Sequence, residues 1–572
     1  MTDLIAYFSM EIALASEIPT YAGGLGVLAG DTLRSAADLG LPMVGMTLLY
    51  RKGYFRQVLD ANGHQTEKDV AWAPEQYLER LPTEVEVQIV GRTVRVGLWR
   101  YRVAGVDGHQ IPVYLLDTDL EGNHEEDRRI TDHLYAGEER YRLTQEAVLG
   151  LGGRRMLDAL GLQPTRYHMN EGHSSLLALD LLRKIWEETR APGPSGLTDG
   201  PPLDTCLARV RAACVFTTHT PIPAGHDRFP RALAEEVFGA QPVALVSQIP
   251  RLLSAELNMS TVGLELSGFV NGVSIRHAEV SRGMFPGHPI HAVTNGVHSG
   301  TWTSPFMQAV FDRHIPNWRR QGHALRNAQR IPVAEIVEAH RAAKRAMIDE
   351  INSMGEHNLD PDRFTIGFAR RVTSYKRINL LLRDVRRLRE IAGRWGSLQI
   401  VFSGKAHPRD HEGKRLIEAV FRQQEALLPY VRLVFVPGYD MRLGGKITAG
   451  VDLWLNTPTA PLEASGTSGM KAVHNGVPNL SVRDGWWCEG YVAGHTGWVI
   501  EPPGEGEGSV DDRDADHLYR ILDNEVLHMY VGNQARWGEV MRDCIALAAS
   551  YFNSQRMVEE YVTRAYGLTL AR

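Results

Sequence analysis

The segment LWLNTPTAPLEASGTSGMK spans residues 453–471 and joins an apolar run to a turn of small residues. Its first part, 453–456, is short and apolar, which predicts a buried strand. The small residues of 463–469 predict a turn, and we expect a helix from about Met470. A strand, a Gly-rich turn and a helix in this order are typical of a parallel α/β sheet, where such turns bind phosphate.

The same alternation of strand and helix extends on both sides of this segment. The apolar strand candidates are 4–10, 44–50, 167–169, 213–217, 364–368, 398–402, 431–436 and 453–456. This order predicts an α/β protein with two doubly wound, Rossmann-like domains, 1–325 and 326–572. Ligands of such sheets bind beyond the carboxyl ends of the strands, so we expect the functional site in the cleft where the domains face each other.

Residues 54–117 depart from this alternation. Apolar and polar residues alternate there around turn signals such as Ala61-Asn62-Gly63, which predicts a small antiparallel β insertion in the N-terminal domain. Residues 190–202, rich in Pro and Gly, and the acidic residues 501–514 are expected to be surface loops.

The composition is that of a folded globular protein. The 572 residues include 62 Lys and Arg against 68 Asp and Glu, a net charge of −6, so no global attraction to nucleic acid is expected. Four scattered cysteines are too few for a disulfide framework or a zinc site, and we expect no metal and a reducing, cytoplasmic location. No uncharged apolar run reaches about 18 residues and the N-terminus has no basic leader, so neither a membrane span nor a signal peptide is expected.

The turn at 463–471 is a candidate phosphate site. Residues 466–468 precede the expected helix, where exposed backbone N–H groups attract an anion, and Lys471 lies a few residues further on. The segment is not a Walker A loop, because Met470 follows Gly469 and no Lys-Ser or Lys-Thr pair is present. The alternative is an ordinary surface loop with a lysine in the first helical turn.

Cations follow two neighbouring strands of the C-terminal half. Four come directly after the strand at 364–368: Arg370, Arg371, Lys376 and Arg377. Lys405 closes the strand at 398–402 in the same way. Because parallel strands end at the same edge of a sheet, these cations predict one polyanion pocket, and the mixture of Arg and Lys suggests more than one phosphate group.

The N-terminal half contributes a second Gly-rich loop, residues 23–30, between a strand and a helix. It could bind a dinucleotide or pack the helix tightly, but we favour a loop whose N–H groups contact an anion across the cleft. His173 and His219 follow predicted strands. They lack a suitably spaced third metal ligand, so hydrogen-bonded structural roles are the alternative. Asn295 stands in a tight turn at 294–296.

Taken in order, these motifs resemble the α-glucan phosphorylase family, the relatives of glycogen phosphorylase. The most specific match is Glu-Ala-Ser-Gly-Thr at 463–467 with Met-Lys at 470–471, and the resemblance runs from 23–30 through most of the chain. It implies a glycosyltransferase-B fold, in which the two domains face across a cleft, and the cofactor pyridoxal 5′-phosphate.

The resemblance also implies roles for single residues. Lys471 would form the Schiff base with the cofactor. The cofactor phosphate would be held by Gly466, Thr467, Ser468 and Arg370. The substrate phosphate would be held by Arg371 and Lys376, with Gly24 from the other domain. The glucosyl pocket would be lined by Glu463, Ser465, Gly466, His219 and Asn295, with His173 close by. The catalytic set is then Lys471, Arg371, Lys376, His219 and Glu463, with the His219 carbonyl supporting positive charge.

The implied reaction is the retaining phosphorolysis of an α-1,4-glucan or maltodextrin. Inorganic phosphate attacks the terminal glucosyl residue and yields α-D-glucose 1-phosphate, with the cofactor phosphate as acid–base partner. A second phosphate pKa near 6 suits that exchange at neutral pH. The chain is shorter than the animal members and begins almost at the Gly-rich loop, so their N-terminal regulatory control is not expected. A homo-oligomer is compatible with the resemblance.

Two other functions remain open at this point. A glycogen- or starch-synthase-like glucosyltransferase would share the architecture and use a nucleotide sugar, but it has no role for Lys471. A catalytically silent glucan-binding homologue would keep the fold without turnover. The phosphorylase motif departs from the family at Ser468-Gly469, where Gly-Asn is usual, and at Arg370, where Lys is usual; both changes keep the polarity or the charge.

Overall fold

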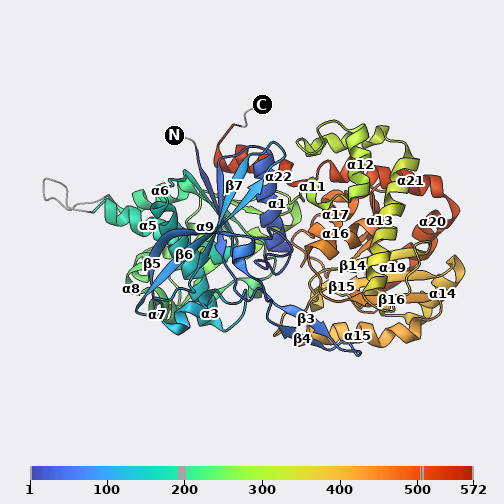
Figure 1. The fold of residues 1–572 in the computed structure, drawn as a ribbon, viewed down its shortest axis with the longest axis horizontal. Helices are drawn as coiled ribbons and strands as arrows, with labels where there is room; N and C mark the ends of the chain where they lie inside the picture. Colours follow the sequence, from blue (N-terminus) through green and yellow to red (C-terminus); the bar gives the residue numbers. More distant parts are fainter. Residues whose placement is uncertain (1–2, 191–200, 503, 505–507, 570–572) are drawn as a thin grey trace.

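The computed structural model describes residues 3–190, 201–502, 504 and 508–569. Two large sheets, each covered by helices, dominate the molecule, one built mainly from the first half of the chain and one from the second (Figure 1). The strands β10 (Arg228–Pro230) and β11 (Glu256–Asn258) form a small antiparallel pair of their own. The predicted α/β architecture with two mainly parallel sheets is confirmed. Most of the loop expected at 190–202 lies outside the described residues.

The first sheet has nine strands. In sheet order they are β13 (Ile290–Ala292), β12 (Phe269–Gly272), β9 (Cys214–Thr217), β8 (Arg166–Asn170), β1 (Ile5–Phe8), β2 (Met43–Leu48), β7 (Gln110–Asp117), β6 (Arg92–Ala104) and β5 (Glu79–Ile89). The strands from β13 to β7 are parallel, and β6 and β5 are antiparallel additions at one edge. The buried parallel strands are nearly continuous apolar runs because helices cover both faces.

The second sheet has six parallel strands. Their order is β16 (Val431–Val436), β15 (Leu398–Ser403), β14 (Phe364–Ala369), β17 (Leu453–Asn456), β18 (Asn479–Val482) and β19 (Gly497–Ile500). The strand order reverses between β14 and β17, and in the first sheet it reverses between β1 and β8. Such reversals open a crevice at the carboxyl ends of the strands.

The helices fall into two groups. Those of the first sheet are α1 (Gly24–Asp38), α2 (Glu125–Arg128), α3 (Glu139–Ala147), α4 (Gly153–Ala159), α5 (Leu176–Glu188), α6 (Leu203–Ala213), α7 (Arg231–Phe238), α8 (Ala240–Val246), α9 (Met259–Glu265) and α10 (Ile275–Met284). Those that follow are α11 (Ser299–Trp302), α12 (Pro305–His314), α13 (Val333–Ser353), α14 (Val385–Trp395), α15 (His411–Leu427), α16 (Met441–Gly450), α17 (Thr467–Val473), α18 (Trp487–Gly490), α19 (Val510–Ile521), α20 (His528–Gly532), α21 (Gln534–Asp543) and α22 (Ser554–Glu560).

The β insertion expected at 54–117 is present but splits in two. Only β3 (Arg56–Leu59) and β4 (Gln65–Lys68) form a separate antiparallel hairpin, which lies beside α15 of the other half (Figure 1). The remaining strands, β5 to β7, join the nine-stranded sheet, because β7 pairs in parallel with β2.

The hydrophobic cores do not follow the proposed division at residue 325. Val297, Trp302 and Phe311 belong to the same buried cluster as Phe364 of the second sheet. Near the other end of the chain, α22 packs on α1, and Met557 shares a cluster with Ile5 of the first sheet (Figure 1). If the chain is divided into two domains by its cores, it passes from the first to the second near residue 297. The last helix, α22, then belongs with the first sheet.

Of the surface loop predicted at 501–514, residues 503 and 505–507 lie outside the described residues, and the prediction is wrong for the last residues. A helix, α19, begins at Val510, where the Ser509 side chain and Asp512 form a reciprocal cap. None of the helices in the described part of the chain combines the length and the hydrophobicity that spanning a bilayer requires.

Candidate active site

A cavity of about 500 Å³ lies where the two sheets face each other. Residues at the carboxyl ends of strands from both sheets line it. The lining includes Lys405 and all the residues to which the resemblance assigned a role: Gly24, His173, His219, Asn295, Arg370, Arg371, Lys376, Glu463, Ser465, Gly466, Thr467, Ser468 and Lys471. Residues from 24 to 471 are thus brought into one place by the two strand-order reversals.

A buried ion cluster joins the loops that follow β14 and β17. Lys376 Nζ lies 2.7 and 2.6 Å from the two carboxylate oxygens of Glu463, and Arg370 Nη1 lies 3.0 Å from Oε2. Burial alone would raise the pKa of Glu463, but Lys376 and then Arg370 outweigh it and lower that pKa to about 2. The carboxylate is therefore ionised at neutral pH.

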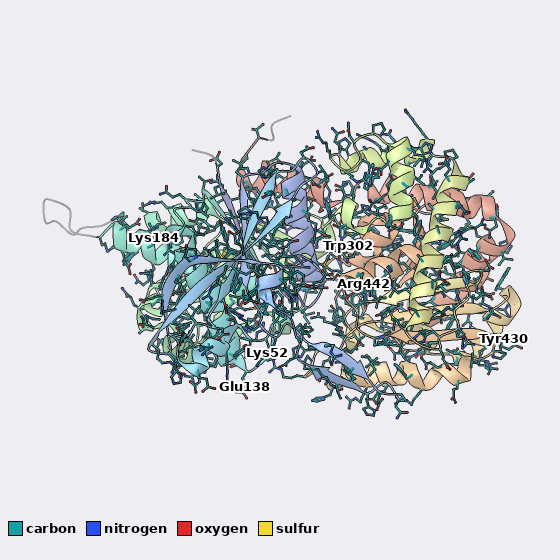
Figure 2. The ribbon with its side chains drawn as sticks, in the orientation of Figure 1. Lys52, Glu138, Lys184, Trp302, Tyr430 and Arg442 are labelled. Carbon is teal, nitrogen blue, oxygen red and sulfur yellow. The ribbon has the colours of Figure 1, made fainter. Side chains whose placement is uncertain are left out.

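Lys471 is buried against an aromatic ring. Its Nζ lies 3.5 Å from the centroid of the Trp302 ring, and the Trp302 indole N–H donates to Asp31 Oδ2 at 2.7 Å. Figure 2 shows Trp302 where the two halves of the molecule meet, far from Lys184 and Tyr430 at the outer ends. Burial lowers the pKa of Lys471 to about 8, against an opposing effect of Asp31. At neutral pH most of this amine is still protonated, but its unprotonated, nucleophilic fraction is far larger than that of an exposed lysine.

The turn before Lys471 ends at Gly466. Gly466 adopts φ 88° and ψ 56°, a left-handed conformation that suits glycine, and caps α17. The helix begins at Thr467 and not at about Met470, because the small residues already take helical angles. Arg370 Nη2 donates to Ser468 Oγ at 3.2 Å, which places the guanidinium against this turn.

Arg377 does not join the pocket, contrary to the prediction of four converging cations. It takes φ 49° and ψ 51°, which turns its side chain away from the cavity. There it pairs with Asp511 at 2.8 Å and Asp514 at 2.7 Å, and it donates to the Thr457 carbonyl. These aspartates lie in the segment expected to be a plain loop, and they anchor α19 to the loop that carries the cations.

The Gly-rich loop of the first sheet is held from within. Glu11 Oε2 accepts the backbone N–H groups of Ala22 at 2.6 Å and Gly23 at 3.1 Å. These two donors are therefore already used, and an anion contact is left to residues further along the loop. At Gly24 nothing lies within 4 Å of the position a Cβ would take, so the cavity side of Gly24 is open.

His219 is fixed on two sides. Its Nε2 lies 2.6 Å from Asn170 Oδ1, and its backbone N–H donates to Glu171 Oε2 at 2.7 Å. An amide oxygen only accepts, so Nε2 carries the hydrogen and Nδ1 is an acceptor. Burial lowers the pKa of His219 well below its usual value, so the ring is neutral.

Several buried polar atoms of the cavity wall have no hydrogen-bond partner among the described residues. They are His173 Nε2, Asn295 Oδ1, Arg370 Nε and Ser465 Oγ. Each lines the cavity, and unpaired buried polar groups in a native structure indicate a ligand or water. Both donors and acceptors are present, which suits a ligand carrying hydroxyl and phosphate oxygens.

Sequence reasoning missed four residues that shape this site: Glu11, Asp31, Glu171 and Trp302. Glu11 follows the strand predicted at 4–10, and Glu171 lies between the strand predicted at 167–169 and His173. Asp31 directly follows the Gly-rich loop at 23–30, and Trp302 comes shortly after the turn at 294–296. Glu11 and Glu171 follow strands, whereas Asp31 and Trp302 lie on the helices α1 and α11. A single buried carboxylate or Trp cannot be told from a core residue without its partners.

The two facing α/β units, with a buried lysine of lowered pKa and several cations between them, are the architecture of an enzyme of the glycosyltransferase type. A family model described as carbohydrate phosphorylase matches residues 15–145 and 225–489. The chain belongs to this carbohydrate phosphorylase family and is an enzyme of the glycosyltransferase class. The matched ranges contain the ion cluster and Lys471, whereas His173 and His219 lie in the interval between them.

Relatives support the same assignment over nearly the whole chain. The chain is 39% identical to a maltodextrin phosphorylase of Thermococcus litoralis, covering 99% of this chain and 71% of that protein. It is 37% identical to a glycogen phosphorylase of Mycobacterium tuberculosis, covering 98% and 70%. It is 34% identical to a glycogen phosphorylase of Aquifex aeolicus, covering 99% and 86%.

Proposed function

We propose that this protein is an α-1,4-glucan phosphorylase. Inorganic phosphate would attack the terminal glucosyl residue of a glucan or maltodextrin with retention and yield α-D-glucose 1-phosphate. The names of the relatives, glycogen and maltodextrin phosphorylase, favour this substrate class. The observation that carries the proposal is one interdomain cavity that contains both the buried Lys471 and the cations Arg371 and Lys376.

The residues present fit pyridoxal 5′-phosphate as the cofactor. Lys471 offers a buried amine with a lowered pKa. An aldehyde condenses only with an unprotonated amine, and the lowered pKa raises the fraction in that form. The 466–468 turn, with Arg370 against Ser468, offers donors and positive charge for a phosphate, and Arg370 Nε has no partner among the described residues. When bound, the cofactor would supply a phosphate group that exchanges a proton with the substrate phosphate.

The cations have a defined task in this proposal. Phosphorolysis breaks the bond from the glucosyl C1 to the leaving O4 and forms a bond from C1 to a phosphate oxygen, while the phosphate proton passes to O4. Arg371 and Lys376 would hold the attacking phosphate and offset repulsion between two phosphate groups. Glu463 is not available as a proton donor, because it is ionised and held by Lys376 and Arg370.

The glucosyl pocket is proposed between the two walls of the cavity, with residues from both sheets. Asn295 Oδ1, Ser465 Oγ and His173 Nε2, which lack partners among the described residues, would bind sugar hydroxyls. The His219 carbonyl would support the positive charge that develops on the sugar ring. We place the enzyme in the cytoplasm, in keeping with its free cysteines.

The decisive experiment incubates the purified protein with maltodextrin and inorganic phosphate and follows glucose 1-phosphate by phosphorus NMR, which also reports the α configuration. We expect phosphate-dependent release of α-glucose 1-phosphate and its loss in Lys471→Ala. A matched control is Lys184→Ala at the outer end of α5 (Figure 2), which should be fully active. Glucosyl transfer that requires a nucleotide sugar and ignores phosphate would instead support the synthase-like alternative, and no turnover would support the silent homologue.

A further inference from the structure

Glu171 stands in a backbone conformation that glycine adopts readily and other residues rarely do. It joins β8 to a short 3₁₀ turn, Gly172–Ser174, with φ 81° and ψ 166°. A non-glycine residue in this region is strained and persists only where its surroundings over-determine it. Glycine would provide the same turn without strain, so the side chain must be retained for its contacts.

Those contacts use both carboxylate oxygens. Oε1 accepts the N–H of Gly172 at 2.9 Å. Oε2 accepts the backbone N–H of His219 at 2.7 Å and the Thr220 hydroxyl at 3.0 Å. The backbone N–H of Glu171 also donates to the Thr217 carbonyl at 2.9 Å. One buried carboxylate therefore ties the loop after β8 to the loop after β9.

The segment held in this way faces the cavity. Glu171, His219 and Thr220 all line it, and the neighbouring Asn170 fixes the His219 ring from the other side. Asn170 and Glu171 thus restrain the ring and the peptide of His219 together. Backbone strain at the wall of an active site is a common sign of a pre-organised group.

We propose that Glu171 is a positioning residue for glucosyl transfer. It does not touch the reacting atoms; it holds the His219–Thr220 segment so that the His219 carbonyl stays where the proposed reaction needs it. The strained backbone is the consequence of directing the carboxylate at that segment. This inference rests on the proposed function, because it assigns a role within the phosphorolysis step.

The test compares Glu171→Gly, Glu171→Ala and Glu171→Gln in the holoenzyme. Glycine and alanine both remove the carboxylate, but only glycine relieves the strain, so Glu171→Gly should melt at a higher temperature than Glu171→Ala. Both should lower kcat about 100-fold, the effect expected of a small misplacement of a catalytic group. The KM for phosphate should change less than about threefold, because Arg371 and Lys376 lie on the other sheet. Glu171→Gln keeps one acceptor oxygen and should fall between these variants and the unmodified enzyme.

The matched control is Ser397→Gly. Ser397 also has a positive φ, 78°, but it precedes β15 away from the cavity. Its replacement should leave kcat and KM unchanged. A Glu171→Gly enzyme with kcat within threefold of the unmodified enzyme would overturn the positioning role. A KM for phosphate that rises by the same factor as kcat falls would also overturn it, because that result indicates a general collapse of the site. An unmodified enzyme without phosphorolysis would overturn the proposed function and this inference with it, whereas the first two results leave the proposed function standing.

Discussion

Lys376 and Glu463, separated by 87 positions in the chain, form a buried ion pair with Nζ at 2.7 and 2.6 Å from the two carboxylate oxygens. Both side chains lie at the strand-order reversal of the second sheet, one after β14 and one after β17. Arg370 shares the same carboxylate at 3.0 Å. One anion therefore holds two cations in place and links the cation loop to the turn that leads to Lys471.

Removing that anion should damage both stability and catalysis. Glu463→Gln leaves Lys376 and Arg370 buried without a carboxylate, and breaking one side of a buried ion pair is worth about 3–5 kcal/mol. We expect a loss of that order in the free energy of unfolding, measured with urea. The exposed Glu412→Gln on α15 is the control and should be neutral. A Glu463→Gln protein as stable as the unmodified one would contradict a structural role for this carboxylate.

Because of the same carboxylate, the free energy of unfolding should depend on pH in the acid range. Its pKa lies at about 2 in the folded protein against a usual value of 4.5. A depressed pKa stabilises the folded state above pH 4.5, and this stabilisation is lost as the pH falls toward 2. The difference corresponds to about 3 kcal/mol. Unfolding free energies measured between pH 6 and pH 3 should therefore fall more steeply in the unmodified protein than in Glu463→Gln; parallel curves would show that Glu463 carries no such shift.

Lys471 should react with aldehydes at lower pH than an exposed lysine. Its pKa of about 8 reflects burial, partly offset by Asp31. In protein freed of cofactor, labelling by pyridoxal 5′-phosphate followed by borohydride should be half-maximal near pH 8 and should be located on Lys471 by mass spectrometry. Asp31→Asn removes the charge that raises this pKa, so the midpoint should move to lower pH. Lys68→Ala, an exposed change on β4, should not move it. A midpoint near pH 10 would refute the burial argument.

The β3–β4 hairpin should hold the two halves of the molecule together. Gln57 Nε2 donates to the Gly404 carbonyl and its Oε1 accepts the Gly438 N–H, both at 2.9 Å. Gln65 forms the matching pair with Ala406, at 2.8 and 3.0 Å. These loops follow β15 and β16 and lead to cavity residues, so the hairpin of the first half supports the site from the second.

Replacing Gln57 tests this attachment. Gln57→Ala leaves the buried carbonyl of Gly404 unpaired, which is worth about 1–3 kcal/mol. The N–H of Gly438 also loses its partner, but Gly438 is exposed and water can replace the amide there. We expect a lower melting temperature and a higher KM for phosphate. Gln88→Ala, which removes an exposed amide on β5, is the control. Retained stability in Gln57→Ala would show that the hairpin contact is incidental.

The parts of this structure that the sequence predicts are those set by local pattern. The strand expected at 364–368 is β14, because a strand buried on both faces must be apolar throughout. The pairing of β7 with β2 could not be foreseen, since no local signal records which distant strand lies beside it. Arg370 and Arg377 look alike in the sequence and differ only in the backbone angles of the loop, so only the structure separates the cavity cation from the one that anchors α19.

Arg371 and Arg377 give the sharpest contrast between a ligand site and a structural site. Among the described residues Arg371 forms no ion pair within 4 Å, and it lines the cavity, whereas Arg377 is buried between Asp511 and Asp514. Arg371→Ala should therefore lower kcat/KM for phosphate by about 100- to 1000-fold, the effect of removing a charge-stabilising donor of about 3–4 kcal/mol, with little change in melting temperature. Arg377→Ala should have the opposite pattern of effects. It should lower the melting temperature, because it leaves the buried Asp514 unpaired, while the enzyme that remains folded keeps its affinity for phosphate. Initial rates at varied phosphate and a thermal melt on each variant decide the matter. Equal losses of stability in both variants, or an unchanged kcat/KM in Arg371→Ala, would mean that Arg371 does not hold the substrate phosphate.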